Sequence, residues 1–351
     1  MTLNFLIILI SLFFVSHWFG TINILLSLVF DLVDKPDGDR KLQKSPVPLA
    51  GITLSLLLAT AVSTSLFFEN EFWGRLNIIS NLELTKNIDN PVNWWWVVAG
   101  IIIILIGGLI DDKNNLKSWQ LAIPINVGLL AIVFGGNLRI EALSYPFDTI
   151  IPSFGFLHQF LAWVWLGLCL ATTKFLDGHD GLVSSVGIIN FMVIAFMAFL
   201  PSINQPLIWS ICLVWIACIA GFLPYNLPNA QSYIGEGASE LIGLMIGILS
   251  ILSGAKLATS FSIVGWFLLD LMLVLFIRYK NGKNILQAGR EHWHFRLLDY
   301  GFSKWQVLIM SIILISFTGF FGAVLPTVYK PIIILFELVI LLGIFKVTSR
   351  K

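Results

Sequence analysis

The sequence contains few charged residues, and its first 30 residues, Met1 to Phe30, contain none. Charged residues make up 12% of the 351-residue chain and hydrophobic residues 57%, whereas about a quarter of an ordinary soluble domain is charged. A soluble fold could not hide this much apolar surface, so the composition excludes that class. The net charge of +1 gives no strong positive electrostatic field that would attract nucleic acid, so we expect no nucleic-acid partner.

Cysteine is also scarce, and the three cysteines lie in apolar runs, at Cys169, Cys212 and Cys218. Their spacing matches neither a metal site nor a disulfide framework, so we interpret them as small membrane-buried residues. The charge-free start of the chain lacks the basic beginning and the short apolar core of a cleaved signal peptide. It therefore predicts a retained first helix.

Long apolar runs recur along the whole chain. A helix needs about 20 mostly apolar residues to cross a bilayer, and it pairs its own backbone groups as lipid requires. By that length rule the sequence predicts an all-α polytopic membrane protein with about eleven transmembrane helices. The expected spans are about 3–30, 48–68, 94–110, 119–135, 157–173, 182–200, 206–225, 239–254, 257–277, 306–325 and 331–346.

Lysine and arginine are unevenly divided between the loops that these spans define. With the N-terminus outside, sixteen of the 21 basic residues fall on the inner side and five on the outer side. Because cytoplasmic loops are enriched in basic residues, the bias predicts an outside N-terminus and a cytoplasmic C-terminus in the cell inner (plasma) membrane. Residues 1–351 then form one transmembrane domain with five cytoplasmic loops, at about 31–48, 111–118, 174–181, 226–240 and 278–305.

An acidic pair follows the third span. Asp111 and Asp112 come directly after a charge-free run and two glycines. For one aspartate alone, a solvated helix end is the simpler interpretation. Carboxylates at membrane depth are costly and usually functional, and two adjacent ones repel each other. A cation or a proton is therefore expected between them.

A second acidic motif reads Asp177-Gly-His-Asp180-Gly. The two aspartates would share a face if the segment were helical, and the glycines would let the backbone approach a ligand. The alternative is a glycine-rich turn in which an aspartate caps the next helix. The sequence alone leaves both interpretations open.

The last inner loop contains His292 and His294 between Arg290 and Arg296. A loop that touches lipid head groups is one interpretation. Together with the carboxylates on the same side, the loop instead favours an anion-binding wall opposite an acidic cluster. Mg²⁺ binds through carboxylates and substrate phosphates, which indicates phosphate chemistry. Asp270 lies inside an apolar span, where an acidic residue is expected to form either a functional ion pair or a structural hydrogen bond.

The order of these motifs resembles that of the polyprenyl-phosphate N-acetylhexosamine-1-phosphate transferases, the WecA/MraY type of glycosyltransferase family 4. The resemblance covers roughly residues 30 to 300. The matching residues are Asp34, Pro36, Arg40, Lys41, Pro46, Pro48, Asp111, Asp112, Asp177 to Leu182, Gly221 to Leu223, Asn226, Ala230, Asp270, Arg278, Arg290, His292, His294, Arg296 and Leu297.

The chain departs from the family pattern at several positions. Ala171 and Lys174 stand where the family has asparagines, and Glu236 stands where it has a metal-binding aspartate. Gln43 and Phe295 replace histidines, Ala238 replaces the glycine before Ser239, and Gly289 replaces an aspartate. Of the properties that the resemblance implies, metal ligation is the one that these departures affect most.

The resemblance implies transfer of a sugar 1-phosphate from a UDP-N-acetylhexosamine to polyprenyl (undecaprenyl) phosphate, with release of UMP, at the start of a lipid-linked cell-envelope glycan. The His-x-His-x-Arg-Leu ending is closer to the WecA branch and favours UDP-GlcNAc or a relative as donor. Mg²⁺ is the implied cofactor, with Mn²⁺ as the alternative. The implied partners are polyprenyl phosphate, the UDP-sugar, membrane lipids and a second copy in a homodimer.

The resemblance also implies roles for individual residues. Asp111 is the best candidate for the base or the group that positions the acceptor. The full assignment is Asp111, Asp112, Asp177 and Asp180 as catalytic, Glu236, Asp112 and Asp177 as metal ligands, and Arg40, Lys41, Lys174, Asn226, His292, His294 and Arg296 as substrate contacts. We further expect the Lys174 ammonium to contact the donor pyrophosphate, unless it merely pairs with Asp177.

Two other functions fit parts of the sequence. One is a degenerate family member that binds polyprenyl phosphate or nucleotide without turnover, which the lost asparagine positions motivate. The other is a transporter, because inward charge clusters also mark ion pathways. A transporter should show polar residues in several spans and two related halves, and the sequence shows mainly Asp270 and no halves.

Overall fold

The computed structural model describes residues 3–36, 45–49, 51–68, 92–140, 142–143, 149–150, 155–253, 257–282 and 289–349. Two of the predicted substrate contacts, Arg40 and Lys41, lie outside these residues, as does Gln43. Most of the expected outer loop at 69–93 and part of the last inner loop, 283–288, also lie outside them.

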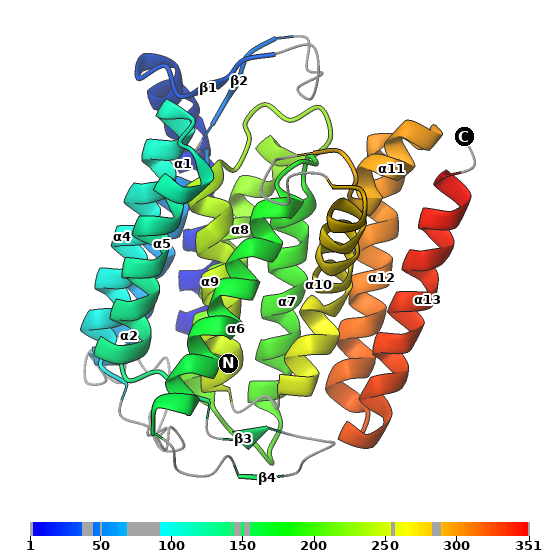
Figure 1. Cartoon of the computed structure of the whole chain (residues 1–351). Coiled ribbons are helices and arrows are strands. Elements are labelled where there is room, and N and C mark those ends of the chain that lie inside the picture. The colour runs from blue at the N-terminus through cyan, green and yellow to red at the C-terminus, as the bar shows by residue number, and fades with distance from the viewer. Residues whose placement is uncertain are drawn as a thin grey trace.

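The described chain is mostly helical, and the elements keep the labels of Figure 1. The helices are α1 Leu3–Val29, α2 Thr53–Phe68, α4 Trp94–Asn114, α5 Ser118–Leu130 continued by the π turn Ala131–Gly135, α6 Gly155–Leu176, α7 Leu182–Phe199, α8 Pro206–Asn226, α9 Glu236–Leu252, α10 Leu257–Lys280, α11 Trp293–Tyr300, α12 Lys304–Val324, the 3₁₀ turn Thr327–Tyr329 and α13 Lys330–Thr348. The strands are β1 Val33–Asp34, β2 Val47–Pro48, β3 Ala142–Leu143 and β4 Thr149–Ile150.

The long helices run up and down in one bundle (Figure 1). Each of the eleven expected spans overlaps one of these helices. In the described residues, eight helices are long and apolar enough to cross a membrane by length and composition. The class predicted from the sequence, an all-α polytopic membrane protein, is therefore confirmed, while the number of spans and the orientation stay predictions.

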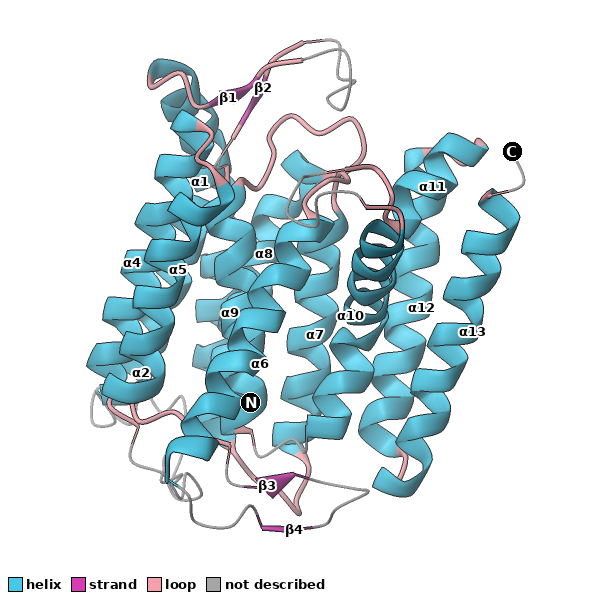
Figure 2. Cartoon of the chain, in the orientation of Figure 1, coloured by secondary structure: helices cyan, strands magenta, loops and turns pink. Residues whose placement is uncertain are grey.

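The two ends of the bundle carry different connections. Two short antiparallel hairpins, β1–β2 and β3–β4, lie at opposite ends (Figure 2). The turns after α4 and α6, the loop between α8 and α9, and helix α11 all lie at the β1–β2 end (Figure 1). The acidic and histidine motifs are therefore gathered at one end of the bundle.

The centre of the bundle is formed by α7, α8 and α9. Nearly every side chain of α9 from Gly237 to Leu252 is buried, whereas α1 and α13 expose many large apolar side chains. Lipid tails would cover such surfaces, and helices in lipid pack closely through small residues. Gly221 of α8 is one of them, because a Cβ there would collide with the backbone of α1 at Phe13.

Candidate active site at the β1–β2 end

The acidic pair lies in the last turn of α4. Asn115 ends this helix in the left-handed conformation, with φ 48°, which asparagine tolerates better than most residues. The Leu116 N–H then donates to Asp111 Oδ1 at 2.6 Å. The sequence Asp-Asp-Lys-Asn-Asn thus forms a helix end that also fixes the orientation of the Asp111 carboxylate.

Asp112 joins α4 to the start of α9. The Glu236 backbone N–H donates to Asp112 Oδ1 at 2.8 Å, and Glu236 is the first residue of α9. A carboxylate is stabilised by the positive end of a helix dipole. The contact requires close packing of two glycines, since a Cβ on Gly108 would collide with the Gly237 backbone. This explains the glycine before the acidic pair.

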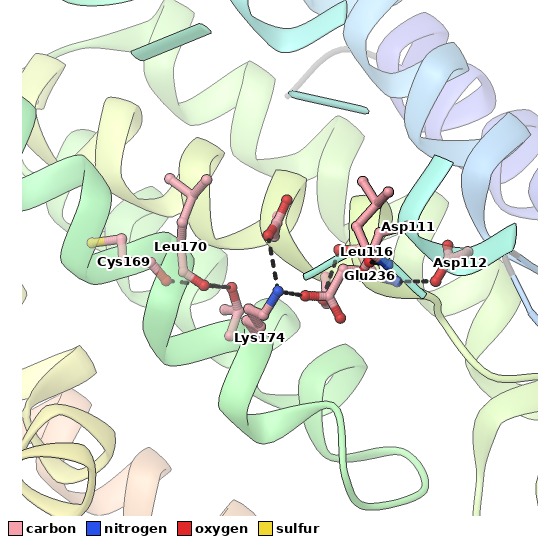
Figure 3. A network of polar contacts seen from close by, with 10 residues as sticks. Asp111, Asp112, Leu116, Cys169, Leu170, Lys174 and Glu236 are labelled. Atoms are coloured by element: carbon pink, nitrogen blue, oxygen red, sulfur yellow. Dashed lines mark hydrogen bonds and ion pairs between the residues drawn. The ribbon is translucent and has the colours of Figure 1, made fainter. Parts of the chain in front are cut away.

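Lys174, in the last turn of α6, lies among these carboxylates (Figure 3). Its ammonium forms an ion pair with Glu236, and Glu240 Oε1 lies 3.7 Å from the same nitrogen. The Glu240 side chain is 1% exposed and that of Lys174 is 32% exposed. Lys174 therefore pairs with two glutamates of α9 rather than with Asp177, the partner that its spacing suggested.

Asp177 follows directly in the turn between α6 and α7. Because the segment is a turn, Asp177 and Asp180 do not share a helical face, and Gly181, with φ 75°, starts α7 without a side-chain cap. Burial raises the pKa of Asp177 well above its usual range, and the nearby carboxylates of Asp112 and Asp34 raise it further, against the opposing effect of Lys174. The two acidic motifs are thus close enough to interact electrostatically.

Asp180 has a different environment. Its Oδ2 accepts hydrogen bonds from the Asn229 N–H at 3.1 Å and from the Ala230 N–H at 3.4 Å. Lys304, at the start of α12, donates to the same oxygen at 2.7 Å. The carboxylate thus ties the loop between α8 and α9 to α12. These contacts give Asp180 a structural role, and its predicted catalytic role stays a prediction.

Asn226 is likewise used inside the protein. Its Nδ2 donates to the Ser232 carbonyl at 3.1 Å, and its Oδ1 accepts from Ser184 Oγ at 3.0 Å. The residue is 3% exposed. It fixes the loop that leads into α9, so its predicted substrate contact stays a prediction.

His292 is held by Asp270, the aspartate inside α10. His292 Nδ1–H donates to Asp270 Oδ2 at 2.7 Å, while the Trp293 N–H donates to the other carboxylate oxygen at 3.1 Å. A partner on one ring nitrogen decides which nitrogen carries the proton. The sequence left an ion pair and a structural hydrogen bond open for Asp270, and the structure shows the hydrogen bonds, which direct Nε2 of His292 away from α10.

His294 is fully buried between the other two histidines of this end. Its ring centroid lies 5.9 Å from that of His292 and 6.2 Å from that of His179. Burial lowers the pKa of His294 well below its usual range, with smaller contributions from His292, His179 and Arg290. Within the described residues neither ring nitrogen has a hydrogen-bond partner. The ring therefore holds an unsatisfied donor and an unsatisfied acceptor inside the protein.

The turn containing Asp177 packs directly on α11. A Cβ at Gly178 would lie 2.5 Å from Phe295 Cζ and 3.5 Å from His294 Nε2. Glycine is needed here for close approach, so the Asp-Gly-His-Asp-Gly motif and the histidine loop meet. The predicted wall of histidines beside a carboxylate cluster corresponds to this contact.

Arg296 does not join this cluster. Its Nε donates to the Glu291 carbonyl at 2.7 Å, and its guanidinium lies 4.1 Å from the ring centroid of Phe345 in α13. Arg278 pairs with the Glu291 carboxylate at 2.6 Å. These contacts attach α11 to α10 and α13, and the predicted substrate contact of Arg296 stays a prediction.

Two residues of the site were not singled out from the sequence. Glu240 lies one helical turn after Glu236, and an acidic residue within an apolar span was the signal that could have identified it. Lys304 had no local signal, because its partner Asp180 is 124 residues away.

The metal site that the resemblance predicts, with Glu236, Asp112 and Asp177 as ligands, stays a prediction. In the described part of the chain, no group of three or more His, Cys, Asp or Glu side chains is placed to hold a metal ion. Glu236, the predicted ligand, is occupied by Lys174, and Asp112 Oδ1 is used at the start of α9. A protonated lysine cannot ligate a cation and repels one.

Similarity to known proteins identifies the family. Residues 94–254 match glycosyl transferase family 4. A probable undecaprenyl-phosphate N-acetylglucosaminyl 1-phosphate transferase of Bacillus subtilis is 30% identical over 246 residues, which cover 68% of each chain. The phospho-N-acetylmuramoyl-pentapeptide-transferases of Staphylococcus haemolyticus and Staphylococcus aureus are 30% and 27% identical, and each match covers 54% of this chain and 58% of the relative. The motifs, the helical bundle and these similarities together show that the chain belongs to glycosyl transferase family 4, the family that contains polyprenyl-phosphate sugar-phosphate transferases.

Proposed function

We propose that this chain transfers an N-acetylhexosamine 1-phosphate, such as GlcNAc 1-phosphate, from a UDP-sugar to polyprenyl (undecaprenyl) phosphate and releases UMP. The product would start a lipid-linked glycan of the cell envelope. The observation that carries the proposal is the convergence of three separate segments at one end of an apolar bundle. The end of α4, the end of α6 and the start of α9 meet through Asp112, Lys174 and Glu236.

The place of this cluster suits the two substrates. A polyprenyl phosphate has its tail in the bilayer and its phosphate at the surface, where the turns of the bundle end. The attacking phosphate oxygen must align with the β-phosphorus of the donor, and alignment is a major source of rate enhancement. Asp111, fixed by Leu116, is the group that we assign to position the acceptor phosphate or accept its proton.

The histidine wall would bind the donor. Asp270 orients His292. The buried ring of His294 holds an unsatisfied donor and acceptor, and if α11 shifts when the donor binds, these could meet a sugar hydroxyl, an amide or a phosphate oxygen. Lys174 supplies positive charge between the two α9 glutamates. In this proposal none of the steps depends on a bound metal ion.

The test is purified protein with undecaprenyl phosphate and a panel of UDP-sugars, with UMP release as the readout. We expect UMP only when the lipid phosphate and a UDP-N-acetylhexosamine are both present. Binding of donor or lipid without UMP from any donor would favour the degenerate, non-catalytic family member. UMP release that does not require the lipid would contradict the proposed acceptor.

His294→Leu is expected to lower UMP release about 10- to 100-fold without lowering thermal stability. Replacing an unsatisfied buried polar group by an apolar one of similar size removes a desolvation cost of about 1–3 kcal/mol. Activity and melting temperature should be measured on the same preparation. His158→Leu, near the start of α6 at the opposite end of the bundle, is the control and should retain activity. Equal activity of both variants would exclude a substrate contact by His294.

The orientation predicted from the basic residues places the β1–β2 end in the cytoplasm. In a background without the three native cysteines, Lys113→Cys and Lys280→Cys should resist an impermeant thiol reagent in intact cells. Ser202→Cys, in the exposed turn between α7 and α8, should react. Labelling of Lys113→Cys or Lys280→Cys from outside would contradict a cytoplasmic active site.

A further inference from the structure

The environment of Lys174 differs from that of a substrate-binding lysine on an open surface. Glu236 and Glu240 are four residues apart, so their side chains lie on one face of α9. The Lys174 nitrogen contacts Glu236 (Figure 3) and lies 3.7 Å from Glu240 Oε1. The Glu240 side chain is 1% exposed. Within the described residues its two oxygens have no hydrogen-bond donor.

A buried carboxylate needs a compensating positive charge or a proton. In the described residues, Lys174 is the basic side chain within ion-pair distance of Glu236 and Glu240. The pair of glutamates and the lysine therefore form one unit, with the ammonium in the position where a cation bridging the two carboxylates would lie.

We infer that Lys174 takes the place of a divalent cation in this active site. Its ammonium pairs with Glu236 and lies 3.7 Å from Glu240 Oε1, so its single charge offsets one of the two carboxylates. The Lys174 side chain is 32% exposed, and in the proposed reaction this exposed part would contact the donor pyrophosphate. An ammonium has three donors, so it can keep its glutamate partners and still donate to a phosphate oxygen. This inference depends on the proposed function only for the identity of the donor. The replacement of a cation at Glu236 by Lys174 depends on their ion pair alone.

The inference and the expectation of Mg²⁺ at Glu236 lead to opposite results for metal binding. If Lys174 replaces the cation, Glu236 contributes nothing to metal affinity in the native protein. Removal of the ammonium then leaves two facing carboxylates, which form an oxygen-rich site of the kind that Mg²⁺ and Mn²⁺ prefer.

Mn²⁺ binding to the purified, full-length protein, followed by electron paramagnetic resonance, tests this directly. We expect native protein and Glu236→Gln to bind Mn²⁺ equally. Lys174→Met should bind Mn²⁺ at least about tenfold more tightly, and the double variant Lys174→Met/Glu236→Gln should lose that gain. Tight binding by the native protein that Glu236→Gln abolishes would overturn the inference, even if Lys174→Met does not fold.

Activity measurements separate this inference from the proposed function. We expect native UMP release in excess EDTA to stay within about tenfold of that in Mg²⁺. Lys174→Asn, which restores the family residue, should become strictly dependent on Mg²⁺. A native enzyme that requires Mg²⁺ and loses this requirement in Glu236→Gln would contradict the inference while supporting the proposed function. Inactivity of the native protein on every donor would contradict the proposed function, and the Mn²⁺ result would still decide the inference.

Discussion

Asp111→Asn is expected to lower UMP release about 10²-fold or more, the usual loss when a positioned acid–base group is removed. The Leu116 N–H holds one oxygen of this carboxylate at 2.6 Å. The amide oxygen of asparagine can accept the same hydrogen bond, so the end of α4 should keep its geometry. The variant therefore removes the negative charge and little else.

The measurement is steady-state UMP release with saturating undecaprenyl phosphate, together with the melting temperature of each preparation. Asp31→Asn is the matched control, because Asp31 is 73% exposed and its ion pair with Lys35, at 3.1 Å, lies on the surface. Both variants should melt as the native protein does, and the control should keep its activity. Near-native turnover of Asp111→Asn would show that the assigned role is wrong.

Gly108→Ala is expected to remove most activity and to lower stability by about 1–3 kcal/mol, the usual cost of an added methyl group in a tightly packed contact. The new Cβ would collide with the Gly237 backbone and lie 3.3 Å from the Glu236 carbonyl carbon. Since backbone atoms cannot rotate away, α4 and α9 must separate. Asp112 would then lose its hydrogen bond to the Glu236 N–H.

Gly343→Ala provides the control for this variant. Gly343 lies in α13, and a Cβ there would have no described heavy atom within 4 Å. Alanine should instead favour the helix by up to about 1 kcal/mol. Melting temperature and UMP release should fall in Gly108→Ala alone. An equal response of the two variants would contradict the close contact between α4 and α9 as the basis of the site.

The helices could be predicted from hydropathy because each apolar run is long and ends at polar or proline-containing turns. The expected spans at 182–200 and 206–225 each differ from α7 and α8 by one residue. The short helix α11 was not predicted, because its eight residues alternate polar and apolar side chains within a basic loop. Periodicity is a weak signal at that length.

The site could be predicted as a set of loops but not as a set of contacts. The adjacent carboxylates, the glycine-rich turn and the paired histidines were visible in the sequence. The partner of Lys174 was not, because local spacing favoured Asp177 whereas the packing of α6 on α9 places Glu236 and Glu240 beside it. Asp180 and Asn226 belong to motifs that predicted function, but their tertiary hydrogen-bond partners could not be predicted from the sequence.

The most direct test of the proposed reaction follows the two phosphorus atoms of the donor. UDP-GlcNAc labelled with radioactive phosphorus at either the α or the β position is incubated with the protein and undecaprenyl phosphate, and the lipid is extracted. Transfer of sugar 1-phosphate predicts that the β label enters the lipid while the α label stays in water as UMP. Retention of both labels in water, or appearance of UDP, would contradict the proposed reaction.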